Sequence, residues 1–260
     1  MTITLASDFG EPYPAAMRGV ILSRTDARLV DVGHGFPRQD PRTAAFWLGE
    51  LLPWFPSATH LAVIDPGVGT DRKALVVRAG EHALVGPDNG VLMPAARELG
   101  DPEVFEIDPA HEEFPDTDGE GSTFDGRDVF APAAAAVHEA GVENLEDLAW
   151  LSALGESEYE SLVFPEPELR EREATGEVLV IDGFGNAITN VPGSVLEGRF
   201  GGDVAVNGTA VPAERGYARV ARGERLVTVG SHGNVELAVN AGRGDEAFGV
   251  GVGSSVRIDY

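Results

Sequence analysis

The stretch HLAVIDPGVGTDR, residues 60–72, contains the clearest structural signal in this chain. Residues 60–64 are nearly all apolar, which is typical of a parallel strand that is covered by helices on both faces. Two glycines then follow Asp65, and glycine lets a backbone approach a ligand closely. The stretch therefore predicts a buried strand that leads into a loop with a binding or catalytic role in an α/β domain.

Around this stretch, strand-like and helix-like segments alternate along the first 160 residues. Asp40 and Pro41 supply an N-cap and a first helical residue. Strands are predicted at residues 2–7, 28–32, 60–64, 74–77, 83–85 and 104–107, and helices at residues 13–25, 40–52 and 131–140. The alternation predicts an α/β fold with a largely parallel sheet over residues 1–160.

The pattern changes beyond residue 160. An acidic stretch that contains Pro165 and Pro167 is predicted to be a linker, residues 161–174. The remaining segments, residues 175–260, show only short strand-like runs, and Asn207-Gly208 between two such runs predicts a hairpin. A second, C-terminal domain is therefore expected to be a small β-barrel.

The composition excludes several functions. Nineteen basic and 43 acidic residues give a net charge of −24, which argues against binding to nucleic acid or to an anionic membrane. The chain has no cysteine, no apolar run long enough to span a membrane and no secretory leader at its start, so a cytoplasmic protein is expected. Lys73 is the only lysine. Such a surface is typical of a high-salt, haloarchaeal cytoplasm, although a GC-rich genome also favours arginine.

Three segments carry candidate functional residues. Asp8 ends the first strand, where it could accept hydrogen bonds from a ribose diol or cap the next helix. Asp65 and Arg72 flank the glycine loop, and Asp125 and Asp128 precede a helix that Asp128 could simply cap. No metal site is expected, because His34 and His60 are interpreted as structural or exposed residues.

Taken together, five motifs resemble the S-adenosyl-L-methionine (SAM) hydroxide adenosyltransferase family, which is related to fluorinase and chlorinase enzymes. They are DFG, VIDPGVGTDR, GPDNG, TFDGRDVFAPAAA and IDGFGNAITN, in this order along the chain. The resemblance implies an N-terminal α/β domain, a C-terminal β-barrel and a homotrimer with the substrate between subunits. It also implies hydrolysis of SAM to adenosine and L-methionine, with no cofactor.

The resemblance also assigns roles to individual residues. Asp8 matches the residue that holds the ribose hydroxyls, and Asp65 and Arg72 match two of three residues assigned to the attacking water. Matches to substrate-binding residues of the barrel are Asp182, Asn186, Ser231, Glu236 and Asn240. From the residues alone, Asp182 and Asn186 could equally belong to a plain turn.

Two departures from the family pattern stand out. Asp125 replaces the usual histidine of TFHGRD, and the loop between Asp8 and Met17 is two residues shorter than usual. The substrate is a sulfonium cation with a neutral leaving group, so an acidic, enclosed pocket suits attack by hydroxide or polarised water. Asp65 and Asp125 could accept a proton from this water, and Arg72 could stabilise the charge of Asp65 or of hydroxide.

Two alternatives remain open at the level of sequence. A halide could replace water and give 5′-chloro-5′-deoxyadenosine, although Asp65 and Arg72 favour water. The replacement of histidine by Asp125 could instead have produced a non-catalytic protein that binds SAM or adenosine.

Overall fold

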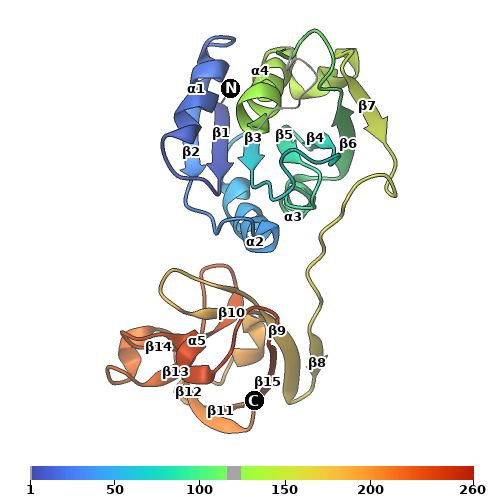
Figure 1. The fold of residues 1–260 in the computed structure, drawn as a ribbon. Helices are drawn as coiled ribbons and strands as arrows, with labels where there is room; N and C mark the ends of the chain where they lie inside the picture. The colour runs from blue at the N-terminus through green and yellow to red at the C-terminus, as the bar shows by residue number, and fades with distance from the viewer. Residues whose placement is uncertain (1, 116–123) are drawn as a thin grey trace. The chain divides into compact units, whose positions relative to one another are not determined.

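The computed structural model describes residues 2–115 and 124–260. The chain divides into two compact units, residues 1–163 and 164–260. Each unit has its own hydrophobic core. The two units are described separately below (Figure 1).

A mixed sheet forms the centre of the first unit. Within the described residues it has seven strands, in the order β2-β1-β3-β5-β4-β6-β7. The strands are β1 (Thr2–Ser7), β2 (Arg28–Gly33), β3 (Ala58–Val63), β4 (Ala74–Ala79), β5 (His82–Pro87), β6 (Pro102–Ile107) and β7 (Leu151–Leu154). The central strand β3 is buried along its whole length, as its apolar sequence predicts.

Most of these strands run in the same direction. β2, β1, β3 and β5 pair in parallel, whereas β4 is antiparallel to both β5 and β6. β6 therefore has the same direction as β5, and only β4 and β7 oppose the rest of the described sheet. The prediction of an α/β fold with a largely parallel sheet is confirmed.

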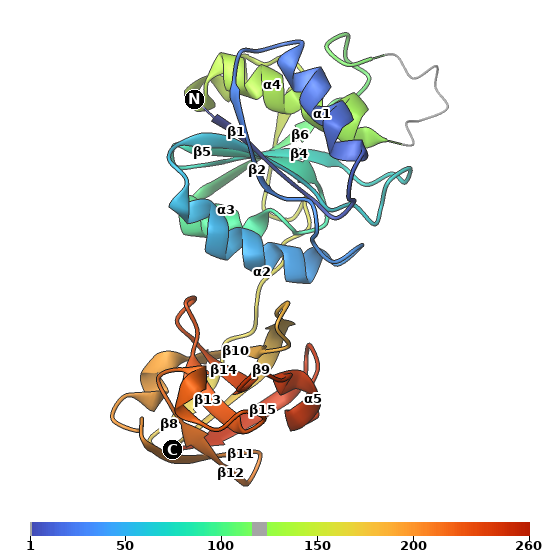
Figure 2. The ribbon, with the colours of Figure 1, turned by 90° about the vertical axis from the view of Figure 1, so that its left-hand side faces the viewer.

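Helices cover both faces of this sheet. Figure 2 shows α1 and α4 on one face and α2 and α3 on the other. The helices are α1 (Tyr13–Leu22), α2 (Pro41–Leu51), α3 (Met93–Leu99) and α4 (Ala131–Ala140), with 3₁₀ turns at Leu52–Trp54 and Val142–Asp147 and a π-helical turn at Gly126–Phe130. Asp40 caps α2 by accepting a hydrogen bond from the backbone N–H of Thr43 at 3.0 Å, as predicted.

The second unit is a closed β-barrel. Seven strands form the ring β10-β14-β13-β12-β11-β15-β9, which β9 and β10 close by antiparallel pairing, and β8 extends β9. The strands are β8 (Glu168–Arg170), β9 (Glu173–Ile181), β10 (Ala187–Pro192), β11 (Gly202–Val206), β12 (Thr209–Ala213), β13 (Arg225–Val229), β14 (Asn234–Val239) and β15 (Ser255–Asp259). Small turns include the 3₁₀ segments Gly193–Leu196 and Tyr217–Arg219.

The predicted hairpin joins β11 to β12. Asn207 and Gly208 have φ values of 48° and 80°, as a two-residue hairpin turn requires, and Val206 pairs with Thr209. The predicted barrel is confirmed, with one addition: the short helix α5 (Gly244–Phe248) lies in a region expected to be entirely β. Because a five-residue helix spans little more than one turn, it leaves no periodic signal in the sequence.

Three further elements were absent from the sequence-based expectation. These are α3, β7 and β10, while β8 and the first residues of β9 fall inside the segment expected as linker. β8 is fully exposed at the edge of the sheet, so its sequence has no apolar alternation. In the described part of the chain, no helix is long and apolar enough to cross a membrane.

Candidate active site

Three of the motifs meet at one edge of the sheet in the first unit. β1 and β3 are parallel neighbours, so Asp8 and Asp65, which follow their carboxyl ends, lie on the same side. The ring of Phe124, next to Asp125, contacts the ring of Phe9 edge to face, with 5.7 Å between their centroids. Residues far apart in the sequence therefore converge where ligands bind in open α/β sheets.

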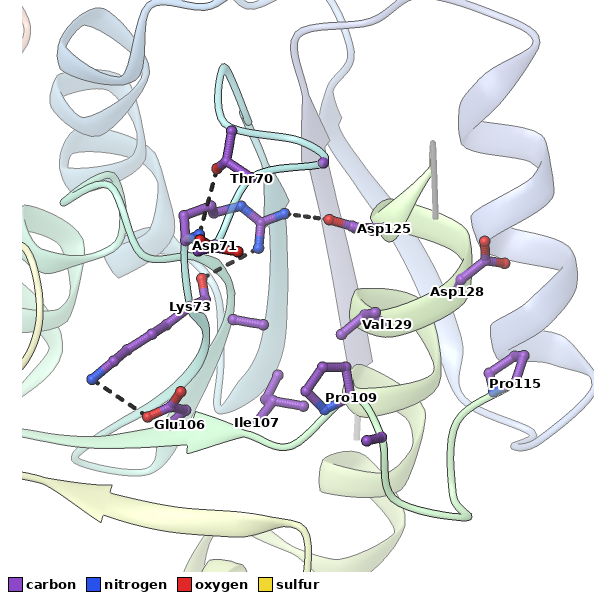
Figure 3. Close-up of a pocket in the computed structure, with 14 residues that line it drawn as sticks. Thr70, Asp71, Lys73, Glu106, Ile107, Pro109, Pro115, Asp125, Asp128 and Val129 are labelled. Carbon is purple, nitrogen blue, oxygen red and sulfur yellow. Dashed lines mark hydrogen bonds and ion pairs between the residues drawn. The ribbon is translucent and has the colours of Figure 1, made fainter. Parts of the chain in front are cut away.

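Asp65, Arg72 and Asp125 form a connected set, called here the acidic trio. Nε of Arg72 donates to the two carboxylate oxygens of Asp65 at 2.9 and 3.0 Å, and Nη2 bonds to the same carboxylate. Nη2 also donates to Oδ2 of Asp125 at 2.7 Å (Figure 3). The three side chains are 6, 13 and 18% exposed in the order Asp65, Arg72 and Asp125. One guanidinium therefore faces two largely buried carboxylates.

Local structure fixes the orientation of each member of the acidic trio. Oδ1 of Asp65 accepts the backbone N–H of Gly67 at 3.0 Å, which holds the carboxylate inside the glycine loop. The guanidinium carbon of Arg72 lies 4.9 Å from the centroid of the fully buried Phe130 ring. Asp125 precedes the π-helical turn, an irregularity that is frequent at functional sites.

The environment of Asp125 favours proton exchange. Burial raises the pKa of Asp125, and the negative charge of Asp65 adds to this rise, while Arg72 opposes it. An open pocket of about 590 Å³ is lined by Arg72, Asp125 and Asp128, so small molecules can reach two members of the trio (Figure 3). A carboxyl group with a raised pKa beside an accessible pocket is suited to general acid–base catalysis.

Asp8 and Asp128 do not cap helices. The N-cap of α1 is Pro12, and Oδ2 of Asp8 instead accepts the backbone N–H of Gln39 at 2.6 Å. Asp128 lies inside the π-helical turn and accepts hydrogen bonds from Arg127 at 2.6 and 2.7 Å. The capping interpretation of both residues is therefore wrong. Ser122 and Thr123 of the same motif lie outside the described residues.

The polar turn GPDNG has a structural role. Asn89 donates to the carbonyl of Ile64 at 2.8 Å and accepts the backbone N–H of Val91 at 3.1 Å. At Gly86 a Cβ atom would lie 2.3 Å from the carbonyl oxygen of Ala62, so only glycine fits. The turn thus supports the strand that positions Asp65.

A second polar group belongs to the barrel unit and is called here the barrel cluster: Asp182, Asn186, Tyr217, His232 and Glu236. The hydroxyl of Tyr217 donates to Oε2 of Glu236 at 2.7 Å, and Nε2 of His232 is 3.1 Å from Oε1. Burial opposes ionisation of Glu236, but the hydrogen bonds from His232 and Tyr217 outweigh it and lower its pKa. Glu236 is therefore a buried negative charge, on the face of β14 opposite to Val235 and Leu237, which pack in the barrel core.

Asp182 and Asn186 complete the barrel cluster and also form a turn. Oδ1 of Asp182 accepts the backbone N–H groups of Phe184 and Asn186 at 2.9 and 2.8 Å, and its Oδ2 accepts from the side chain of Asn186 at 2.9 Å. The side chain of Asn186 also lies 3.4 Å from the Tyr217 hydroxyl. The backbone of these residues therefore forms a turn, as expected. The side-chain amide of Asn186 connects this turn to Glu236 through the hydroxyl of Tyr217.

The remaining barrel candidates lie outside this cluster. Ser231 is exposed in the turn between β13 and β14. The side chain of Asn240 donates to the carbonyl of Val220 at 2.8 Å, so it holds the preceding loop. Sequence reasoning missed Tyr217 and His232. The only available signal was that His232 directly follows Ser231 and lies four residues before Glu236.

Comparison with known proteins identifies the family of both units. Residues 3–149 match the SAM hydroxide adenosyltransferase N-terminal domain, and residues 176–257 match the C-terminal domain of the same family. The chain belongs to the SAM hydroxide adenosyltransferase family. The family membership expected from the five motifs is confirmed.

Individual relatives cover nearly the whole chain. Proteins named (R)-S-adenosyl-L-methionine hydrolase from Thermus thermophilus and Salinispora tropica are 41 and 37% identical to it, over 97 and 98% of this chain and 97% of each relative. The crystal structure of an uncharacterized conserved protein from Thermotoga maritima superposes with a TM-score of 0.83 at 32% identity, with complete coverage of both chains. The match therefore includes both units of this family member.

Proposed function

We propose that this protein hydrolyses SAM to adenosine and L-methionine. The observation that carries the proposal is the acidic trio, in which Arg72 joins Asp65 and Asp125 beside an open pocket. Family membership over both units and the names of the relatives support the same substrate.

In this reaction, an oxygen of water attacks C5′ of the ribose as the C5′–S bond breaks. The thioether of methionine leaves as a neutral group, because the sulfur loses its positive charge. One proton of the water must go to a base, and Asp125 is the proposed acceptor since burial raises its pKa. Arg72 holds the Asp65 carboxylate and orients it toward the same water. The scheme uses side chains of the protein and no added cofactor.

The proposed substrate contacts follow the family pattern. Asp8 binds the ribose hydroxyls, and Asp182, Asn186, Ser231, Glu236 and Asn240 bind the adenine and methionine ends. Of the barrel residues, Asp182, Asn186 and Glu236 belong to the connected barrel cluster. Since Ser231 and Asn240 lie outside it, we expect their substitution by alanine to have the smaller effects.

Product analysis tests the reaction directly. The purified protein is incubated with SAM and chloride in water enriched in ¹⁸O, and the products are separated by mass spectrometry. We expect adenosine with ¹⁸O at the 5′ position. Formation of 5′-chloro-5′-deoxyadenosine would indicate halide attack, and SAM binding without turnover would indicate a sensor. Either result would refute the proposal.

We further propose that the active form is a homotrimer in which substrate binds between subunits. The support is that Asp8 and the trio belong to one compact unit, whereas the barrel cluster belongs to the other. Light scattering during gel filtration tests this, and a fully active monomer would contradict it. The cytoplasmic location stays a prediction, which fractionation of the source cells tests.

A further inference from the structure

The segment of residues 34–39, between β2 and α2, is fastened to the end of β1 at two points. Nδ1 of His34 lies 2.8 Å from Oγ of Ser7, the last residue of β1. At the other end, the backbone N–H of Gln39 donates to Oδ2 of Asp8 at 2.6 Å. The orientation of the Asp8 carboxylate therefore depends on a segment that is separate in sequence.

His34 is held through both nitrogens of its ring. Its Nε2 is 3.1 Å from Oδ1 of Asp31, and Arg18 donates to both oxygens of that carboxylate, at 3.2 and 2.7 Å. A proton on Nε2 faces the Asp31 carboxylate, while Nδ1 contacts Ser7, a fully buried residue whose hydroxyl also donates to the carbonyl of Phe9 at 3.3 Å. Contacts at both nitrogens thus hold the ring of His34 in one orientation.

Two backbone irregularities direct this segment toward Asp8. Leu5 pairs with Asp31 but Ala6 pairs with Gly33, so β2 contains one extra residue just before the segment. Such bulges re-aim the chain and are frequent beside active sites. Gln39 has a φ of 57°, a left-handed conformation that is uncommon for a residue other than glycine. Strain of this kind persists where the surrounding structure imposes it.

Asp8 is only 9% exposed, and Gln39 occupies one of its two carboxylate oxygens. Among residues 2–115 and 124–260, the structure records no hydrogen bond to Oδ1. A carboxylate with one oxygen fixed by the protein presents the other in a defined direction, which suits recognition of a hydroxyl group.

We propose that His34 and Ser7 are positioning residues that fix segment 34–39, and through Gln39 the Asp8 carboxylate, for binding the ribose hydroxyls. The inference rests on the proposed function, in which Asp8 contacts the ribose. It predicts that loss of the His34–Ser7 contact weakens binding of the nucleoside and leaves the chemical step at C5′ nearly unchanged.

Two amide substitutions of His34 test each ring nitrogen separately. His34→Asn keeps a polar atom near the Nδ1 position, facing Ser7, whereas His34→Gln keeps one near the Nε2 position, facing Asp31. We expect His34→Gln to raise the KM for SAM and the calorimetric Kd for adenosine by about 10-fold, the effect of one lost buried hydrogen bond. We expect kcat of His34→Gln to change less than about twofold. His34→Asn should retain most of the wild-type affinity for SAM and adenosine.

A double-mutant cycle identifies the partner. Ser7→Ala alone should weaken adenosine binding about as much as His34→Gln, and the double variant should show little further loss because both remove the same contact. Fully additive losses would overturn the proposal. An unchanged Kd for adenosine in His34→Gln, or a loss confined to kcat or to the thermal midpoint, would also overturn it.

Adenosine binding separates this inference from the proposed reaction. If the wild-type protein binds adenosine but does not hydrolyse SAM, the proposed function fails, while the effect of His34→Gln on Kd still supports the positioning role. If Asp8→Asn binds adenosine as tightly as the wild type, Asp8 does not recognise the ribose and the positioning role fails with it.

Discussion

The acidic trio and the barrel cluster each bury carboxylates, but they compensate the charge differently. In the trio, a single guanidinium serves two carboxylates, those of Asp65 and Asp125. In the barrel cluster, Glu236 receives hydrogen bonds from Tyr217 and His232, and Asp182 receives two from the backbone and one from Asn186. Asp65 also accepts the backbone N–H of Gly67, so Asp125, with one recorded donor among the described residues, is the least compensated carboxylate of the two sites.

This difference separates chemical reactivity from binding. At Asp125, where donors are scarce, burial raises the pKa of the carboxyl group, which favours its protonated form and the exchange of a proton. At Glu236 burial opposes ionisation, but the hydrogen bonds from His232 and Tyr217 lower its pKa and so favour the charged form. We therefore expect substitutions in the trio to alter turnover and substitutions in the barrel cluster to alter affinity.

The largest effects are expected from removal of a trio carboxylate. Asp125→Ala should lower kcat by about 10²–10⁴-fold, the usual contribution of a general base, with little change in SAM binding. Asp65→Ala should be at least as damaging, because Arg72 would lose its main partner. Steady-state kinetics and calorimetric SAM binding measure both quantities. A wild-type kcat in Asp125→Ala would show that Asp65 and Arg72 suffice for water attack.

Restoring the family histidine should keep the activity and move its pH dependence. A base works only when deprotonated, so kcat rises with pH through the pKa of residue 125. In Asp125→His this rise should move toward the imidazole range near ~6.5. Activity measured from pH 4 to pH 9 in both proteins tests this. An unchanged profile would mean that residue 125 does not titrate in the rate-limiting step.

In the barrel cluster, Glu236→Gln is the matched test, because it keeps the shape and removes the charge. We expect KM for SAM to rise about 10-fold, as for loss of a charge-assisted hydrogen bond, while kcat changes less than about threefold. Tyr217→Phe removes one donor to Glu236 and should give a smaller rise in KM. A fall in kcat with unchanged KM in Glu236→Gln would contradict the division between the two sites.

Acid should destabilise the first unit through His60. His60 is buried between Thr4 and His82, and burial lowers its pKa to about 3, with a further contribution from His82. An unfolded histidine takes up a proton near pH 6.5, so folding stability falls as pH drops from ~6.5 toward 3, by at most about 1.4 kcal/mol per pH unit. Denaturant unfolding at several pH values should show a weaker dependence in His60→Gln. An equal pH dependence of unfolding in His60→Gln and the wild type would exclude His60 as the cause of the acid sensitivity.

Salt should stabilise the two units unequally. The first unit carries 29 acidic and 10 basic residues, a net charge of −19, whereas the second carries 14 and 9, a net charge of −5. Because salt screens self-repulsion, raising potassium chloride from about 0.1 M to 2 M should increase protection from hydrogen exchange mainly in residues 1–163. The thermal midpoint should rise by several degrees. No change in either quantity would count against adaptation to high salt, which stays a prediction.

The sequence alone determined the two-part architecture and the family. The apolar run at residues 60–64 predicts a central buried strand, and the helix predicted at residues 131–140 coincides with α4. Both signals are local, because periodicity and apolar content along a segment reflect how that segment is buried. Elements with little apolar pattern, such as the exposed edge strand β8, left no such signal.

The tertiary structure alone decided which residues act together. Arg72 and Asp125 are 53 positions apart, and their hydrogen bond exists because the β3 loop and the turn before α4 meet at one sheet edge. Tyr217 joins the barrel cluster only because closure of the barrel brings it to Glu236, and His34 reaches Ser7 only because β2 pairs with β1. Contacts between distant segments depend on strand order and register, and these are set by packing of the whole domain rather than by any local stretch of sequence.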